Sequence, residues 1–349
     1  MAASRLGSLC SLNLLKVSCF QQVWHSAPLY RTTLTHLPRQ SQWRTPLRKF
    51  HQRSRRRDDI VEQKNGYPTY RDLLKPLGFT IMFSGACFAG SMVWQYEMTR
   101  LKAKKIISNW ISNEGRDVFY PKSHSFRSHV NMWWNSLSDG QKYVVSIIGA
   151  NVLVFLAWRL PSAQPTLMKY FCSNPNSAAP CWSMLLSAFS QYNFMHLFTN
   201  MYVLWSFSNV ALNLFGKEQF LAFYLSSATV ASLLSYCVKI TRCQFTPSVG
   251  ASGALMAVLG AVCLTYPNAQ LSIAFIGDII PHSFSASAVL KVIIAFDTVG
   301  VLAGWKFFDH AAHLGGMLFG LWYVTYGRKL IWEQRESVQK WWHHIRGDP

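Results

Sequence analysis

The sequence predicts an all-α membrane protein in which one leading helix precedes a group of six. Half of the 349 residues are hydrophobic, 15% are aromatic and only 14% are charged, whereas about a quarter of the residues in a soluble domain are charged. Long uncharged stretches recur along the chain, as they do in proteins that cross a bilayer several times. This composition excludes a disordered, collagen-like or disulfide-stabilised protein.

Seven apolar stretches are candidate membrane helices, because each approaches the roughly 20 residues that a helix needs to cross a bilayer. A polar linker, at about 96–142, separates the first stretch from the rest. The sequence therefore predicts a one-plus-six organisation. In chain order, the stretches are residues 77–95, 143–158, 194–214, 219–238, 251–266, 285–304 and 308–326.

The first 57 residues form a basic leader. They contain nine Arg, two Lys and no acidic residue, and so contribute 11 of the 19 net positive charges. A segment of this composition is typical of a mitochondrial presequence, although a disordered basic tail is an alternative. The remaining net charge of +8 suits membrane-flanking loops, so we expect a lipid bilayer and no nucleic acid as a partner.

Polar side chains occur within the predicted membrane helices, where an unpaired polar group is costly. His196, Ser252 and His313 each lie near the beginning of the second, fourth and sixth helix of the group. Because these helices run in the same direction, we expect the three residues at similar depth. Asp297 lies in the fifth helix, whose opposite direction does not bring it clearly to the serine, and a structural hydrogen bond is its favoured role.

Ser252 lies between glycines, in the sequence Gly-Ala-Ser-Gly-Ala that begins at Gly250 and contains Gly253. Glycines allow close approach of the backbone and leave the hydroxyl unshielded. The hydroxyl is therefore a candidate nucleophile. The alternative interpretation is a helix N-cap in a packing motif of small residues.

His313 is followed by Gly316 and Gly320, which form a GxxxG face one turn further along its helix. Small residues on the fourth helix, starting with Gly253, provide a matching surface. Such faces let two membrane helices pack closely. We expect this packing to bring His313 within about 3 Å of Ser252, the distance that proton transfer requires.

His196 and Asn200 are four residues apart and share one face of their helix. Near Ser252 they would stabilise an oxyanion, and each well-placed donor contributes roughly 3 to 4 kcal/mol. A metal site formed by His196, His310 and His313 is the alternative. The chain contains no HExxH motif and no carboxylate close to the serine in sequence, so no metal and no cofactor are predicted.

Taken together, these motifs resemble those of the rhomboid intramembrane serine proteases, over about residues 136–328. The leading helix, the basic leader and the runs NMYVLWSFS and GWKFFDHAAHLGG are similar to the mitochondrial subgroup of that family. Many rhomboids carry a Trp-Arg pair in the first loop, but Cys181-Trp182 has no neighbouring Arg here. The motifs that carry the resemblance are GASGA with Ser252, His196-x-x-x-Asn200 and His313-x-x-Gly316-x-x-x-Gly320.

The resemblance implies an intramembrane endopeptidase of the mitochondrial inner membrane that supports mitochondrial dynamics and quality control. In this reading Ser252 is the nucleophile and His313 the base, without a third acidic member, and His310 is the fallback base. His196 and Asn200 form the oxyanion hole with the backbone N–H of the serine. The substrates would be single-span membrane proteins, cleaved in or near their transmembrane helix.

Two other functions stay open at this point. A catalytically inactive rhomboid relative that binds client helices is disfavoured by the presence of the serine, the histidine and both oxyanion candidates. A small-solute transporter is disfavoured by the lack of visible inverted repeats. The predicted domains are 1–57 for the presequence or leader, 58–135 for the extra helix and linker, 136–328 for the rhomboid core and 329–349 for a C-terminal tail.

Overall fold

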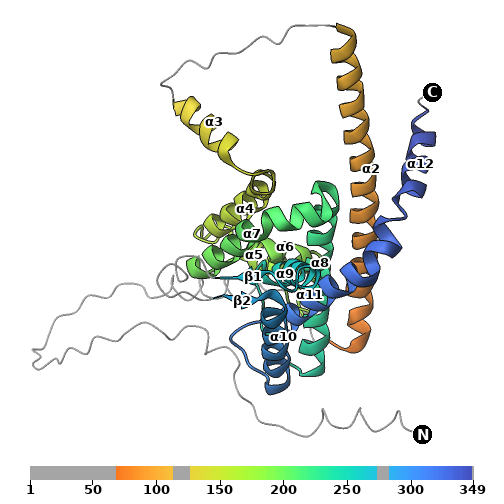
Figure 1. Ribbon diagram of the computed structural model, residues 1–349. Coiled ribbons are helices and arrows are strands. Elements are labelled where there is room, and N and C mark those ends of the chain that lie inside the picture. Colours follow the sequence, from red (N-terminus) through yellow and green to blue (C-terminus); the bar gives the residue numbers. More distant parts are fainter. Residues whose placement is uncertain (1–67, 113–125, 273–282, 348–349) are drawn as a thin grey trace, which may run out of the picture. The chain divides into compact units, whose positions relative to one another are not determined.

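Helices form nearly all of the structure (Figure 1), a computed structural model that describes residues 68–112, 126–272 and 283–347. The predicted presequence lies outside the described residues. The elements before the GASGA segment are η1 (Tyr70–Leu73), α2 (Leu74–Ser112), α3 (Phe126–Ser136), α4 (Asp139–Ala157), α5 (Gln164–Tyr170), α6 (Pro180–Leu186), η2 (Ser187–Phe189), α7 (Phe194–Phe215) and α8 (Lys217–Thr241). The later elements are α9 (Ser252–Thr265), β1 (Gln270–Leu271), β2 (Phe284–Ser285), α10 (Ala286–Ala303), α11 (His310–Trp322), the π-helix η3 (Tyr323–Trp332) and α12 (Arg335–Arg346).

The predicted fold class, an all-α membrane protein, is confirmed, and a helix lies at each of the seven predicted stretches. Within the described residues, four helical segments are long and apolar enough to cross a membrane: Tyr70–Trp110, Asp139–Ala157, Lys217–Thr241 and Ala286–Ala303. The helix α9, with 14 residues, is shorter than a usual span. The number of crossings, and with it the one-plus-six layout, therefore stays a prediction.

Local sequence signals explain where several helices begin and end. Ser138 caps α4 by accepting a hydrogen bond from the Gln141 backbone, and the Gln141 side chain completes a capping box. Ser285 caps α10 in the same way through the Ala288 backbone. Gly304 ends α10 in the left-handed conformation, with φ 70°, which glycine adopts without strain.

The helix α9 lies at the centre of the bundle, in contact with α7, α8, α10 and α11 (Figure 1). Every residue from Gly253 to Cys263 is buried except Met256. A helix that is apolar all round is buried by protein rather than exposed to lipid or water on one side. The first residue of this buried helix is Ser252, so the candidate nucleophile is held by the most enclosed element of the fold.

The first long helix of the described chain, α2, contacts its last helix, α12. The predicted C-terminal tail contains α12, which packs against α2. Trp342 Nε1 donates to Glu97 Oε1 at 2.8 Å, and Arg346 forms an ion pair with the same carboxylate. Gln339 Nε2 donates to the Met92 carbonyl at 3.3 Å. The leading helix is therefore held by the last helix as well as by α8.

Candidate active site

Ser252 and His313 meet across the contact between α9 and α11. Ser252 Oγ lies 2.8 Å from His313 Nε2, which is hydrogen-bonding distance. The N-cap of α9 is Ala251, so Ser252 is the first helical residue and not the cap that the alternative interpretation required. His310, the fallback base, directs its Nδ1 to Asp297. The structure thus brings together the serine and the histidine that the sequence pairs.

Backbone contact between α9 and α11 depends on two glycines. A Cβ atom added at Gly316 would overlap the carbonyl oxygen of Gly253, and one added at Gly320 would overlap the carbonyl oxygen of Ala257. No side chain can be accommodated there unless the helices move apart. This is the close approach that the glycine stripes predict, and it sets the distance from Ser252 to His313.

Gly250 is predicted, with Gly253, Gly316 and Gly320, to allow helix packing at the site, but it does not lie on a helix. It lies in the loop before α9 and has a φ of 138°, a conformation that other residues rarely adopt. A Cβ added there would be 2.7 Å from His196 Cε1 and 3.6 Å from Ser252 Oγ. The imidazole of His196 and the serine hydroxyl therefore flank this glycine, and its missing side chain leaves room for the ring.

Asn200 belongs to a buried chain of amides. Its Nδ2 donates to Gln191 Oε1 at 2.8 Å, and Gln191 Nε2 donates to Asn151 Oδ1 at 2.9 Å. Asn151 in turn donates to the Ile147 carbonyl at 2.8 Å. An amide nitrogen carries two hydrogens, so the bond to Gln191 orients Asn200 and uses one of its two donors. No sequence pattern indicates Gln191 or Asn151, which the structure adds to the surroundings of Asn200.

Asp297 lies beside His313, although the predicted pair of Ser252 and His313 has no acidic third member. Its Oδ1 lies 3.3 Å from His313 Nδ1 and 2.7 Å from His310 Nδ1. The carboxylate is only 2% exposed. Helix direction alone does not bring Asp297 to the serine, but the lateral contact between α10 and α11 brings it to the histidine. Ser252, His313 and Asp297 therefore lie in one hydrogen-bonded row.

A second polar cluster ties the loop before Ser252 to the beginning of α11. Asp309 caps α11 through Oδ1, which accepts from the Ala312 backbone at 3.0 Å. Its Oδ2 accepts from Ser235 and Ser248 and lies 3.1 Å from Lys239 Nζ. The cluster joins α8, the loop before Ser252 and α11, and so links the two elements that carry Ser252 and His313.

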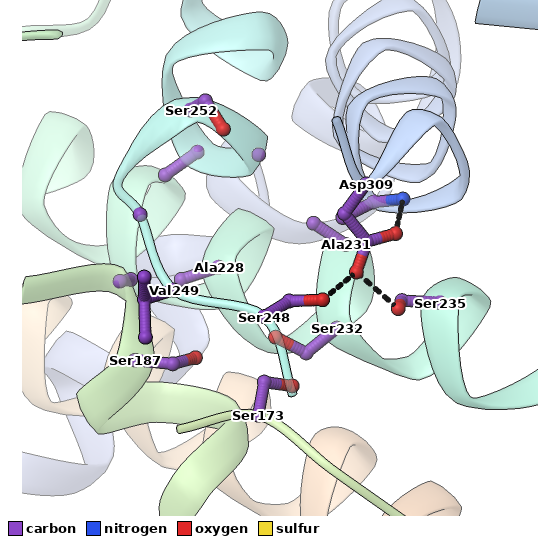
Figure 2. Close-up of a pocket in the computed structure, with 15 residues that line it drawn as sticks. Ser173, Ser187, Ala228, Ala231, Ser232, Ser235, Ser248, Val249, Ser252 and Asp309 are labelled. Atoms are coloured by element: carbon purple, nitrogen blue, oxygen red, sulfur yellow. Dashed lines mark hydrogen bonds between the residues drawn. The ribbon is translucent and has the colours of Figure 1, made fainter. Parts of the chain in front are cut away.

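A cavity of about 30 Å³ separates this cluster from the serine (Figure 2). Figure 2 shows Ser252 on the α9 side and Asp309 on the α11 side, with hydrogen bonds from Ser248 and Ser235 to the carboxylate. The volume suffices for about one or two water molecules, and its hydroxyl-rich wall provides the polar partners that a buried water needs. The lining thus suits water beside the nucleophile.

Neutralising Asp309 is expected to destabilise the protein. Asn at this position still caps α11, but it leaves the Lys239 ammonium buried without its countercharge, which costs about 3 to 5 kcal/mol. We therefore expect Asp309→Asn to lower the melting temperature in detergent, measured by tryptophan fluorescence. Adding Lys239→Met should recover most of the loss, because the unpaired charge is then gone.

The matched control for this experiment is the exposed ion pair between Lys340 and Glu336, whose side chains are 82% and 78% exposed. Surface pairs contribute about 0 to 1 kcal/mol, so Glu336→Gln should leave the melting temperature nearly unchanged. A double Asp309→Asn, Lys239→Met variant that melts no higher than the single variant would show that the ion pair does not hold the cluster.

The metal site considered for His196, His310 and His313 does not form in the described residues. His196 lies against Gly250, whereas the group close enough to share an ion consists of Asp297, His310 and His313. The three-residue arrangement at Ser252 fits a nucleophile and its base. The fold and this geometry together define a membrane-embedded helical protein with a candidate serine-hydrolase centre.

Comparison with known proteins agrees with this class. Residues 178–330 match the family model described as "Rhomboid domain". The chain is 49% identical over 290 residues to "Presenilin-associated rhomboid-like protein, mitochondrial" of Homo sapiens, covering 82% of this chain and 76% of that protein. It is 43% identical to "Presenilin-associated rhomboid-like protein A, mitochondrial" of Danio rerio over 78% of this chain and 76% of that protein. It is also 35% identical to "Rhomboid protein 1, mitochondrial" of Saccharomyces cerevisiae, over 63% and 62% respectively.

The chain belongs to the rhomboid family, and within it to the mitochondrial presenilin-associated rhomboid-like group. The predicted family is therefore confirmed. The matched domain begins after α5 and includes all four candidate site residues, His196, Asn200, Ser252 and His313.

Proposed function

We propose that this protein is an intramembrane serine endopeptidase of the mitochondrial inner membrane that cleaves single-span proteins in or near their transmembrane helix. The observation that carries the proposal is the 2.8 Å distance between Ser252 Oγ and His313 Nε2 at the end of the buried helix α9. Membership of the rhomboid family and the mitochondrial names of the relatives support it. The leader 1–57 would direct import, and residues 136–328 would form the protease core.

His313 acts as the general base in this proposal. When Nδ1 carries the proton and donates to Asp297, the lone pair of Nε2 faces the serine hydroxyl. Nε2 accepts the hydroxyl proton while Oγ attacks the substrate carbonyl, and the protonated ring then gives the proton to the leaving amine. Asp297 positions the ring and offsets its positive charge without taking part in bond formation.

The acyl-enzyme that remains is hydrolysed by the same groups. Water in the cavity beside Ser252 loses a proton to His313 and attacks the ester carbonyl, after which Oγ recovers the proton and the product carboxylic acid leaves. The cavity brings water to a nucleophile that a bundle of helices otherwise shields. In this proposal His196, Asn200 and the Ser252 backbone N–H stabilise the oxyanion in both halves of the reaction.

The decisive experiment is cleavage of a labelled single-span substrate by the purified full-length protein in liposomes. We expect two fragments whose masses place the cut in or beside the membrane helix, and no fragments with Ser252→Ala. If the unaltered protein binds the substrate helix without cutting it, the inactive rhomboid-like alternative takes the place of this proposal.

Removing the oxyanion donors should lower turnover in a graded manner. His196→Ala and Asn200→Ala are each expected to reduce kcat by about 10²-fold to 10³-fold with little change in KM, because the donors act mainly on the transition state. Asn200→Ala should also lower the melting temperature, since Gln191 loses a buried partner, a cost of about 1 to 3 kcal/mol.

Asn213→Ala is the matched control, because Asn213 is exposed on the same helix, α7. It should change neither the turnover nor the melting temperature. Unchanged kcat in both His196→Ala and Asn200→Ala would leave these residues as helix-pairing polar groups and remove them from the oxyanion hole.

A further inference from the structure

Three ionisable side chains behind the serine lie close enough to share one ion. Asp297 Oδ1 is 2.7 Å from His310 Nδ1 and 3.3 Å from His313 Nδ1. One ligand atom from each residue lies within 4.8 Å of the other two. A tetrahedral zinc ion with bonds of about 2.0 to 2.1 Å separates its ligand atoms by about 3.3 Å. The contact of Asp297 with His313 already has this spacing, and the contact with His310 would have to lengthen.

The carboxylate of this cluster is buried between the two imidazoles. In the described part of the chain, the two histidines are the only ion-pair partners of Asp297, whose side chain is 2% exposed. Two imidazole nitrogens and one carboxylate oxygen are ligands that zinc prefers.

His310 is held rigidly although the proposed reaction does not use it. The rings of Phe296, Trp305 and Phe308 surround its imidazole at centroid distances of 5.3 to 5.9 Å. A Cβ at Gly300 would come within 2.5 Å of the ring. Among the described residues, its buried Nε2 has no hydrogen-bond partner. The packing therefore holds His310 Nδ1 towards Asp297. A nitrogen held beside a carboxylate in this way is a preorganised metal ligand.

We propose that Asp297, His310 and His313 form a site for Zn²⁺, with a fourth position open to water, and that zinc there inhibits the protease. The binding stands on the geometry of the three residues, whereas the inhibition rests on the proposed function. The side chain of His313 is 12% exposed and provides the route by which the cluster reaches the surface. The ion would be exchangeable and would not be a cofactor of the reaction.

Inhibition follows from the position of one proton. Coordination through Nδ1 requires the lone pair of that nitrogen, so the proton of neutral His313 moves from Nδ1 to Nε2. Nε2 then donates to Ser252 Oγ instead of accepting from it, at the same 2.8 Å contact. That hydrogen bond holds the ring in place for the metal, as second-shell partners of zinc-bound histidines commonly do. The serine keeps its proton and cannot attack.

Binding is tested first, with Co²⁺ as a spectroscopic substitute for zinc in the purified full-length protein. We expect the visible absorption of tetrahedral cobalt to grow to one equivalent and to disappear when Zn²⁺ is added. His310→Asn should abolish this absorption, because its amide still donates to Asp297 but is a poor zinc ligand. The exposed-histidine variant His129→Ala, His344→Ala should retain it. Absorption that persists in His310→Asn would overturn the site.

Inhibition is tested by titrating zinc into the cleavage assay, with each variant compared with its own rate in EDTA. We expect zinc to stop cleavage by the unaltered protein, EDTA to restore it, and His310→Asn to need at least tenfold more zinc. His310→Phe, which keeps a ring in the aromatic cage, should behave like His310→Asn and serves if that variant fails to fold. If both His310 variants were inhibited at the same zinc concentration as the unaltered protein, inhibition through this site would be refuted. If no cleavage occurs in any sample, the proposed function fails, and the cobalt absorption still decides the metal site.

Discussion

Replacing His313 by alanine is expected to abolish cleavage as fully as replacing Ser252. The two side chains meet at 2.8 Å, and His313 is held from its other side by Asp297. Two groups that act as one unit lose nearly the whole of their effect when either is removed. The cleavage rate of each single variant should therefore be lower by about 10⁴-fold or more. The double variant should show no further loss. Rates of fragment release from a labelled substrate in liposomes provide the measurement.

Exposed residues of the same types provide the controls. Ser337→Ala and His344→Ala change α12 at positions open to solvent and should retain the rate of the unaltered protein. The melting temperatures of the Ser252 and His313 variants should stay close to that of the unaltered protein, which separates loss of chemistry from loss of folding. If His313→Ala cleaves normally and His310→Ala does not, the base has been assigned to the wrong histidine.

Enlarging Gly316 is expected to remove activity without altering any polar atom. Even a Cβ there overlaps the carbonyl oxygen of Gly253, and this atom belongs to the backbone of a buried helix that cannot turn away. Overpacking costs typically about 1 to 3 kcal/mol, and a displacement near 1 Å between reacting groups costs about 10²-fold in rate. Gly316→Leu should therefore cleave at least about 100-fold more slowly, with Gly316→Ala between it and the unaltered protein.

Gly149→Leu is the control for this substitution. Gly149 lies within α4, and a Cβ added there meets no atom within 4 Å. Its cleavage rate should stay near that of the unaltered protein. Full activity in Gly316→Leu would mean that the α9–α11 contact does not set the position of His313.

The sequence identifies those parts of the site that depend on depth in the membrane and on spacing along one helix. His196, Ser252 and His313 are predicted at a similar depth because each lies near the beginning of a helix that runs in the same direction, and GxxxG spacing indicates close packing directly. Which neighbouring helix a residue faces is harder to infer from the sequence. Asp297 meets His313 because α10 packs beside α11, with Gly300 against the His310 ring, and no pattern within α10 indicates that neighbour.

Long-range polar pairs escape sequence analysis for a similar reason. Lys239 lies at the end of an apolar stretch, where a lysine is typical of a membrane-flanking residue. Its partner Asp309 is distant in sequence and stands beside two histidines, which draw attention to metal or proton chemistry instead. Only the folded chain shows that the pair is buried and that it links the loop before Ser252 to α11.

The contact between α2 and α12 has a consequence for the order in which the molecule is completed. Its partners are separated by 244 to 249 residues of chain, so one side of the contact is synthesised long before the other. Contacts of such wide separation form late, because a long loop has to be closed before they contribute. The leading helix can pack against α8 during synthesis, but its contacts with Gln339, Trp342 and Arg346 form only after α9 and α11 have been made.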